Sequence, residues 1–244
     1  MISWIHESIK AIWFFLKFAL FIVASYLLLL SLLWLLKQPV FVGLRQGSAV
    51  AFELLAQMET AVKVLGGLIL STSLLRFLDR YFLRGWVIRR LSLISGTSFS
   101  VLRLFTFPFI HKDNAHLAGN MPLLLLFAAV SVFLLPSITL IIVILMMFFV
   151  QGAGVWIFGG KNVPHGGTSG LLLGFFSFDV SYGLFAGSWM TAVALIILII
   201  FGRRMFKNLT NRSPDISVAT HVWGFLGGIF AAILISPFGF FAAY

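Results

Sequence analysis

The sequence predicts an all-α protein that crosses a membrane several times. Of its 244 residues, 61% are hydrophobic and only 10% are charged, and the mean hydropathy is +1.08. A soluble domain with an ordinary polar surface would carry many more charges. Several apolar stretches also reach the roughly 20 residues that a helix needs to cross about 30 Å of hydrocarbon. We therefore expect an integral, multi-pass protein of a plasma or inner membrane.

The apolar stretches predict seven spans, one followed by six. The first, at 12–36, is too long for a cleaved signal peptide, and a mixed segment of interfacial character follows it. We expect residues 1–60 to form an N-terminal extension and residues 61–244 to form the main bundle. The six further spans are expected at 61–78, 116–135, 137–157, 168–180, 184–202 and 217–236.

Composition narrows the chemistry and the partners. The chain has no cysteine, which excludes disulfides, thiolate nucleophiles and Cys-ligated metals, so any nucleophile is an oxygen or a nitrogen. Its net charge of +10 comes from 17 Lys and Arg against 7 Asp and Glu. In a membrane protein such an excess suits loops that touch anionic lipid headgroups. We expect the lipid bilayer as a partner and no nucleic acid, since no soluble domain is left to bind it.

The stretch "VPHGGTSGLLLGFF", residues 163–176, begins an apolar helix with small and polar residues. Glycine and serine are common where membrane helices start or pack, so this motif alone decides nothing. The span is also short, ending near Asp179. Its polar start is tolerable only where a helix end faces a water-filled cavity within the protein.

Two further polar groups stand out in apolar surroundings. His221 opens the last span, and Gly224 and Gly228 follow it on nearly the same helix face, where another backbone can approach. It is either a general base or a structural histidine bonded to a carbonyl. The stretch "FPFIHKDNAHLAGNMP" holds His111, and then His116 and Asn120 one turn apart.

These residue types can be combined into one chemistry. Acyl transfer requires a hydroxyl nucleophile, a base that works near neutral pH and donors for an oxyanion. Ser169, His221 and the His116/Asn120 pair are of these types, and a helix start at Ser169 would add backbone N–H groups. A Ser–His dyad is the economical interpretation, because no acidic residue has an evident third position. A metal site lacks a carboxylate or thiol ligand here, so we expect neither metal nor cofactor.

The sequence resembles the rhomboid family of intramembrane serine proteases over about residues 61–236. The matching segments are "FIHKDNAHLAGN" for the H-x4-H-x3-N pattern, "GTSG" for G-x-S-G and "HVWGFLGG" for the last-helix histidine. The resemblance implies a six-helix bundle, here with one extra N-terminal transmembrane helix, that cuts transmembrane protein substrates near small residues. It implies Ser169 as nucleophile, His221 as base, and His116, Asn120 and the Ser169 N–H as the oxyanion hole. Supporting roles are expected for Gly167, Gly170, Gly224, Gly228 and His111.

Two other functions compete with the protease. A rhomboid-like pseudoprotease that binds membrane helices would be expected to lose the serine or the histidine, and this chain keeps both. A channel or transporter would line a polar path with the same histidines. Only the protease needs the hydroxyl of Ser169.

The distribution of Lys and Arg predicts which side of the membrane the loops face. With seven spans, the N-terminus lies on the same side as the loops at 76–115, 158–167 and 203–215. Fourteen of the 17 basic residues lie on that side, so the positive-inside rule predicts that this side, and with it the mouth of the candidate site, is cytoplasmic. The family resemblance suggests the opposite orientation, and a membrane crossing at 38–59 would place the N-terminus on the other side. A single cysteine introduced at Asn211 should be protected from an impermeant maleimide on right-side-out cells until lysis. Strong labelling of intact cells would contradict this orientation.

Overall fold

The computed structural model describes residues 49–97, 99–111, 114–210 and 217–236. The predicted first span at 12–36 lies outside these residues. The chain divides into two compact units, Met1–Ile69 and Leu70–Tyr244. Helix α3 (Ala49–Tyr81) begins in the first unit and ends in the second. It runs through residue 60, and the expected division between extension and bundle at that residue stays a prediction.

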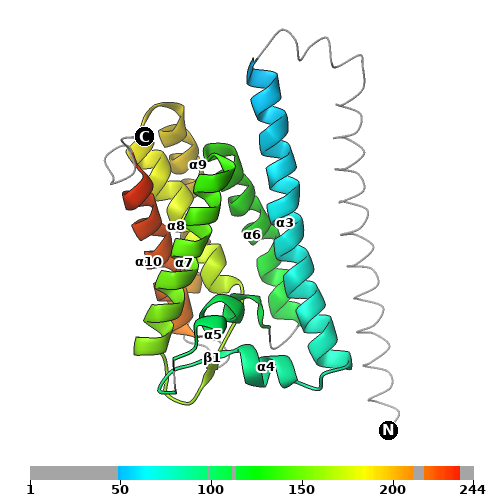
Figure 1. Cartoon of the computed structure of the whole chain (residues 1–244). Coiled ribbons are helices and arrows are strands. Elements are labelled where there is room, and N and C mark those ends of the chain that lie inside the picture. The colour runs from blue at the N-terminus through cyan, green and yellow to red at the C-terminus, as the bar shows by residue number, and fades with distance from the viewer. Residues whose placement is uncertain (1–48, 98, 112–113, 211–216, 237–244) are drawn as a thin grey trace, which may run out of the picture. The chain divides into compact units, whose positions relative to one another are not determined.

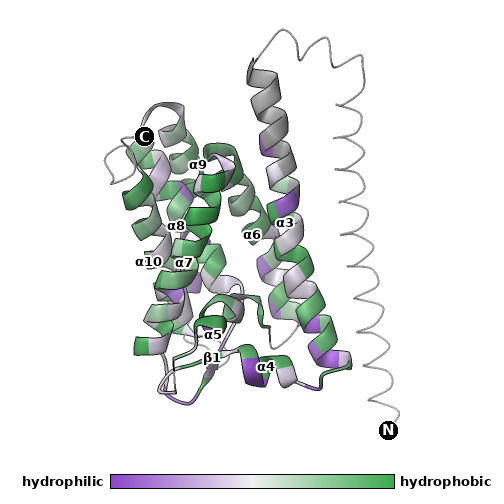
Figure 2. Ribbon diagram, viewed as in Figure 1, coloured by the Kyte–Doolittle hydropathy of each residue, from purple (hydrophilic) through white to green (hydrophobic). Residues whose placement is uncertain are grey.

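The second unit is almost entirely helical (Figure 1). Five of its described helices, α6 to α10, are long and apolar enough to cross a membrane, which confirms the all-α, multi-pass membrane fold. Figure 2 shows these helices as mostly hydrophobic, whereas hydrophilic residues gather on α4 and at the end of α3. After α3 the elements are α4 (Trp86–Leu91), β1 (Leu93–Ile94), α5 (Val101–Thr106), η1 (Phe107–Phe109), α6 (Asn114–Leu134), α7 (Ser137–Phe158), β2 (Pro164–His165), α8 (Ser169–Ala186), α9 (Ser188–Thr210) and α10 (Val218–Ile235).

Helix α8 is longer than the sequence predicts. The break expected at 181–183 is wrong, because α8 continues to Ala186 and the chain turns at Gly187, where φ is +71°. Gly183 lies inside the helix, and a Cβ there would stand 2.7 Å from the Met190 carbonyl oxygen of α9. This glycine therefore permits a close approach of two helices and does not end one.

Helix α9 also extends beyond its predicted end. The polar loop expected at 203–215 starts later, since α9 continues to Thr210. Arg203, Arg204 and Lys207 are exposed on its last turns. Of these, Lys207 lies in the last turn of α9, where a basic side chain interacts favourably with the helix dipole.

Helix α8 packs mainly against α10, and glycines make the contact. A Cβ at Gly224 would overlap the backbone of Gly170, and a Cβ at Gly228 would overlap the Gly174 carbonyl. Membrane helices associate without a hydrophobic driving force, so close backbone packing is a main source of their attraction. The Ser177 hydroxyl adds a 2.7 Å hydrogen bond to a backbone carbonyl of α10. The two helices that carry Ser169 and His221 are thus held in direct backbone contact.

Helices α6 and α8 are joined by a buried polar pair. The Ser131 hydroxyl of α6 donates to Asp179 Oδ1 at 2.6 Å, and both side chains are buried. Asp179 was expected at the end of a span, but it lies near the middle of α8. Phe127 of α6 also contacts Phe176 of α8, with 5.4 Å between the ring centroids. Because an acidic side chain is costly inside a membrane unless it is paired, this bond specifies how α6 and α8 meet.

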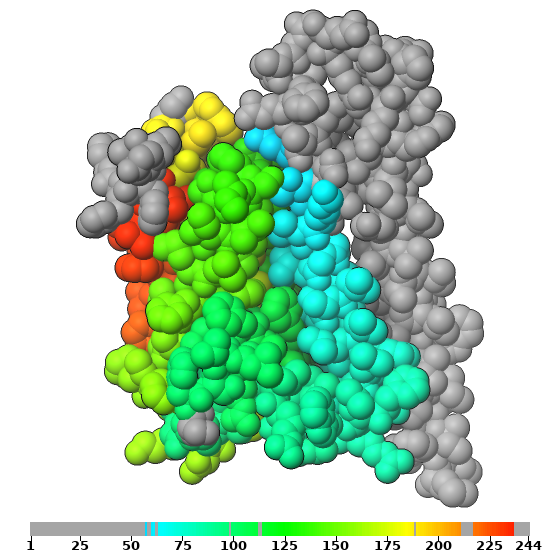
Figure 3. Space-filling model, viewed as in Figure 1, coloured from blue at the N-terminus to red at the C-terminus, as the bar shows by residue number. Residues whose placement is uncertain are grey.

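A short antiparallel pair joins the chain before α5 to the loop before α8. Strand β1 pairs with β2 so that Leu93 lies opposite His165. At the end of α7, Trp156 Nε1 donates to the Thr97 carbonyl at 3.1 Å. Helix α5 contacts α7 where Leu104 covers a glycine, and Figure 3 shows this segment and α7 as one closely packed face. The loop that leads to Ser169 is therefore tied to a separate part of the chain.

Replacing Gly224 by alanine is expected to weaken the α8–α10 contact. The added Cβ would overlap the backbone of Gly170, and overpacking of this kind typically costs about 1–3 kcal/mol. Thermal unfolding of the purified protein in detergent should show a lower midpoint for Gly224→Ala than for the wild type.

Gly119→Ala in α6 is the matched control for that variant. A Cβ at Gly119 would meet nothing within 4 Å, and alanine favours a helix over glycine by about 0.5–1 kcal/mol. Gly119→Ala should therefore unfold at or above the wild-type midpoint. Equal midpoints for the two variants would contradict a tight contact at Gly224.

Candidate active site

The loop before α8 presents Ser169 at the first position of that helix. Just ahead of it, Gly167 has a φ of +115°, a conformation that side chains disfavour. A Cβ at Gly167 would lie 3.8 Å from both Ser169 Oγ and His116 Nε2, and 4.0 Å from His111 Nε2. The predicted nucleophile and two histidines from the α6 region therefore surround one small volume beside Gly167.

His221 lies in the first turns of α10 and is held by a backbone carbonyl. Its Nδ1 is 2.6 Å from the carbonyl oxygen of Asn208. A carbonyl only accepts hydrogen bonds, so Nδ1 carries the hydrogen, and Nε2 of the neutral ring is left as an acceptor. Nε2 is buried and has no hydrogen-bond partner among the described residues. The ring thus has the tautomer that a general base at Nε2 requires.

The helix contact brings the serine and the histidine segments together. Gly224, three residues after His221, meets the backbone of Gly170, the residue after Ser169. A Cβ at Gly170 would also lie 2.6 Å from the carbonyl oxygen of Thr220, which precedes His221. The two predicted catalytic residues therefore flank the same backbone contact.

Helix α6 carries His116 and Asn120 one turn apart, as their spacing predicts. The His116 and His111 ring centroids are 6.2 Å apart. Asn120 Nδ2 is buried and has no hydrogen-bond partner within the described ranges. Leaving a buried donor unsatisfied costs about 1–3 kcal/mol. A substrate oxygen that accepted a hydrogen bond from Asn120 Nδ2 would remove this cost. No group of three His, Asp or Glu side chains in the described part of the chain is arranged to hold a metal ion.

His111 fixes the turn that precedes Ser169. Its Nε2 accepts the backbone N–H of Thr168 at 3.1 Å and lies 3.0 Å from the Thr168 hydroxyl. Its Nδ1 lies 3.4 Å from the Phe109 carbonyl oxygen. The sequence predicts a supporting role for His111, and the structure identifies Thr168 as the residue through which it can act.

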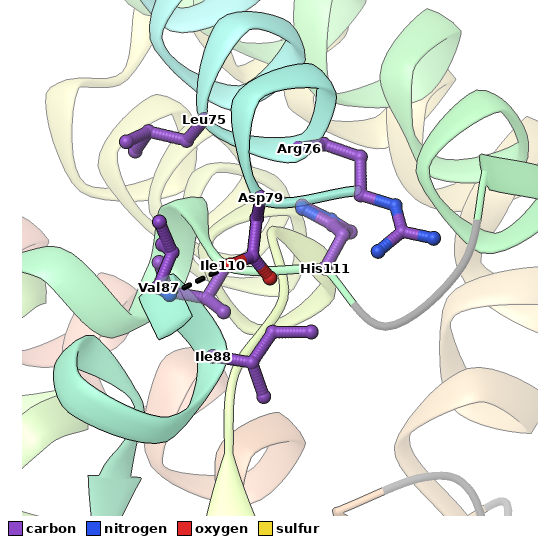
Figure 4. Close-up of a pocket in the computed structure, with 7 residues that line it drawn as sticks. All are labelled: Leu75, Arg76, Asp79, Val87, Ile88, Ile110 and His111. Carbon is purple, nitrogen blue, oxygen red and sulfur yellow. Dashed lines mark hydrogen bonds between the residues drawn. The ribbon is translucent and has the colours of Figure 1, made fainter. Parts of the chain in front are cut away.

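A small pocket lies behind His111 (Figure 4). Asp79 Oδ1 accepts the backbone N–H of Val87 at 2.7 Å, which is the dashed line in the figure. Arg76 Nε donates to Asn114 Oδ1 at 3.0 Å. These bonds secure the starts of α4 and α6 near His111. The pocket is lined by Leu75, Arg76, Asp79, Val87, Ile88, Ile110 and His111.

Gln151 of α7 is a polar residue of the site that the sequence reasoning missed. Its side chain is buried, and neither its Oε1 nor its Nε2 has a hydrogen-bond partner among the described residues. A Cβ at Gly170 would overlap its amide, so Gln151 lies directly beside the residue that follows Ser169. The available signal was a lone amide inside the apolar span 137–157.

Comparison with known proteins identifies the family. The sequence model of a protein family, the rhomboid domain, matches residues 98–238. The chain belongs to the rhomboid family. Uncharacterized proteins of Mycobacterium tuberculosis and Mycobacterium bovis are each 27% identical over 143 residues, which are 53% of this chain and 57% of theirs. One of Mycobacterium leprae is 27% identical over 137 residues, 53% and 54% of the two chains. The match thus spans a little over half the length of these relatives.

The rhomboid domain includes every residue predicted to act in catalysis, and their roles remain predictions. Within this domain the Asn208 carbonyl supplies a means of orienting His221. The predicted site residues within the domain are His111, His116, Asn120, Gly167, Ser169, Gly170, His221, Gly224 and Gly228.

Replacing His111 by phenylalanine is expected to slow reactions at Ser169 more than replacing Thr168 by valine. His111→Phe leaves the buried Thr168 N–H without its acceptor, whereas Thr168→Val removes only the hydroxyl contact and keeps that bond. The rate of covalent labelling by a fluorophosphonate measures the effect. Equal rates for the two variants would show that the His111 bond to the backbone does not hold the turn.

Proposed function

We propose that this rhomboid is an intramembrane serine protease that hydrolyses peptide bonds in or near transmembrane helices through a Ser169–His221 dyad. The observation that carries the proposal is the state of the His221 ring. Its Nδ1–H is bonded to the Asn208 carbonyl, and its buried Nε2 has no hydrogen-bond partner among the described residues. The helix contact beside Gly224 and Gly170 brings this ring near the start of α8.

In the first half-reaction the Ser169 hydroxyl attacks the carbonyl carbon of the scissile bond. His221 Nε2 takes the hydroxyl proton as the bond from Oγ to carbon forms, and then gives it to the leaving amine as the C–N bond breaks. The Asn208 carbonyl accepts the Nδ1 hydrogen in both charge states, and it favours the imidazolium formed in between because the hydrogen bond from a charged ring is the stronger one. This carbonyl takes the part that a carboxylate has in a Ser–His–Asp triad.

In the second half-reaction water replaces the serine on the acyl group. His221 Nε2 removes a proton from the water, whose oxygen bonds to the acyl carbon, and returns it to Ser169 Oγ as the ester bond breaks. Both steps pass through a tetrahedral oxyanion. We assign its donors to His116, Asn120 and the backbone N–H of Ser169, and the buried, unpartnered Nδ2 of Asn120 supports this assignment.

The proposed substrates are membrane proteins cut near small residues. The space beside Gly167 lies within about 4 Å of the Ser169 hydroxyl and of two histidines, where a larger side chain from the enzyme would occupy the reaction volume. The preference for small residues near the cut is carried over from the resemblance to the family. Helices of the substrate also share the bilayer with α6 to α10, which are apolar enough to span it.

Replacing Ser169 or His221 by alanine is expected to abolish cleavage of a model transmembrane substrate. Either change removes the activated nucleophile, and losses of this kind lower the rate by about 10⁴-fold or more. Fluorophosphonate labelling of the purified protein should disappear in Ser169→Ala. Both variants should stay folded in detergent, as judged by their thermal unfolding.

Ser181→Ala is the matched control, since it removes another serine hydroxyl from the same helix. It should keep both labelling and cleavage. Cleavage by Ser169→Ala at the wild-type rate would contradict the serine protease. A folded wild-type protein that is neither labelled nor active would favour the alternative, a pseudoprotease that binds membrane helices.

A further inference from the structure

We propose that His165 is a positioning residue that sets the separation between Ser169 and His221 by bonding to the start of α10. The inference rests on the proposed function of those two residues. His165 precedes Ser169 by four residues, and its bonding partner Ser217 precedes His221 by four. One side-chain bond therefore links the two catalytic segments, at a point four residues before the proposed catalytic residue in each segment.

Ser217 governs the first turn of α10. It is the N-cap residue, and its hydroxyl oxygen accepts the backbone N–H of Thr220 at 3.2 Å. Its carbonyl accepts the backbone N–H of His221 at 3.2 Å. A cap of this kind fixes where a helix begins and how its first turn is oriented. A shift of Ser217 would therefore move His221 with it.

The His165 ring is arranged to receive the Ser217 hydroxyl hydrogen. His165 Nε2 lies 3.3 Å from the Gly160 carbonyl oxygen, which can only accept, so Nε2 carries the hydrogen of the neutral ring. His165 Nδ1 is then an acceptor, and it lies 2.8 Å from Ser217 Oγ. The Ser217 hydroxyl thus accepts a hydrogen bond from the Thr220 N–H and donates its own hydrogen to His165 Nδ1.

His165 itself is held by its backbone and its surroundings. It is the residue of β2 that lies opposite Leu93, and its side chain is only 4% exposed. A Cβ at Gly159 would stand 2.8 Å from His165 Nε2, so the ring occupies space that a glycine leaves open. Leu93 packs with Val155 of α7 in a buried cluster to which α10 also contributes. The ring is therefore a fixed point against which Ser217 is positioned.

A small displacement of the start of α10 would change the separation between Ser169 and His221. A misplacement of about 1 Å between reacting groups can lower a rate by about 10²-fold. Loss of the His165–Ser217 bond would release the start of α10 from the loop that leads to Ser169. The glycine contact further along α8 and α10 would remain, so the fold would persist while the alignment of the dyad changed.

The test replaces His165 by phenylalanine and by asparagine. His165→Phe keeps a ring of similar size but cannot accept from Ser217, and it should lower kcat for a model transmembrane substrate by about 10- to 100-fold with KM within about twofold of wild type. His165→Asn places an amide oxygen near the position of Nδ1 and should restore kcat to within about fivefold. Val163→Ala, an exposed position in the same loop, is the matched control and should match the wild type.

Ser217→Gly tests the same bond from α10. Glycine lacks the hydroxyl but costs a helix cap only a few tenths of a kcal/mol relative to serine. It should reproduce the loss of kcat. The double variant with His165→Phe should be slower than His165→Phe alone by much less than the full effect of Ser217→Gly, because the two changes share the bond between His165 and Ser217 and differ only in the cap bond to Thr220. This variant also keeps the test decisive if His165→Phe fails to fold.

Three results would overturn the positioning role while the proposed function stands. In the first, the wild type is labelled and active, and kcat of His165→Phe or of Ser217→Gly lies within twofold of the wild-type kcat. In the second, the substitutions change only KM or the unfolding midpoint. In the third, their effects on kcat are additive in the double variant. Absence of fluorophosphonate labelling at Ser169 in the wild type would instead contradict the proposed function, and the positioning role would fall with it.

Discussion

The candidate site depends on the direct backbone contact between α8 and α10. Gly170 and Gly174 on one helix meet Gly224 and Gly228 on the other, and a single added carbon at Gly224 or Gly228 would overlap a backbone. In a membrane, where lipid is as apolar as a leucine side chain, such contact replaces the hydrophobic effect as the force that joins helices. It also sets the scale of the site, because no side chain separates the two backbones near Ser169.

Polar groups within the helices divide into two classes. Some hold the fold, as in the bond from Ser131 to Asp179 and the bond from Asp79 to the start of α4, although the second oxygen of each carboxylate has no partner among the described residues. Those around the start of α8 include buried atoms without partners among the described residues: His221 Nε2, Asn120 Nδ2 and both amide atoms of Gln151. Unsatisfied buried groups are costly, so these four atoms are consistent with a site that water or substrate completes.

The spacing of residues along the sequence predicted much of this arrangement, whereas contacts made by backbone atoms could not be predicted from it. The four-residue interval put His116 and Asn120 on one face, and the spans predicted at 116–135 and 137–157 agree closely with α6 and α7. The carbonyl that orients His221 could not be predicted, because every residue type at position 208 would supply one. The break expected between the spans 168–180 and 184–202 is wrong for a related reason, since a glycine such as Gly183 suits both turns and close helix contacts and only the fold decides between them.

The Ser131–Asp179 bond also bears on how the chain enters the bilayer during synthesis. An aspartate near the centre of a helix opposes insertion by about 2.5–3.5 kcal/mol, and α8 begins with further polar and small residues. Alone, α8 is therefore a poor candidate for transfer from the translocon into lipid. Its partner Ser131 lies on α6, which is synthesised earlier and is strongly apolar. Stable integration of α8 therefore requires α6, which provides the hydrogen-bond partner of Asp179. The helices that build the site thus enter the membrane as an assembly.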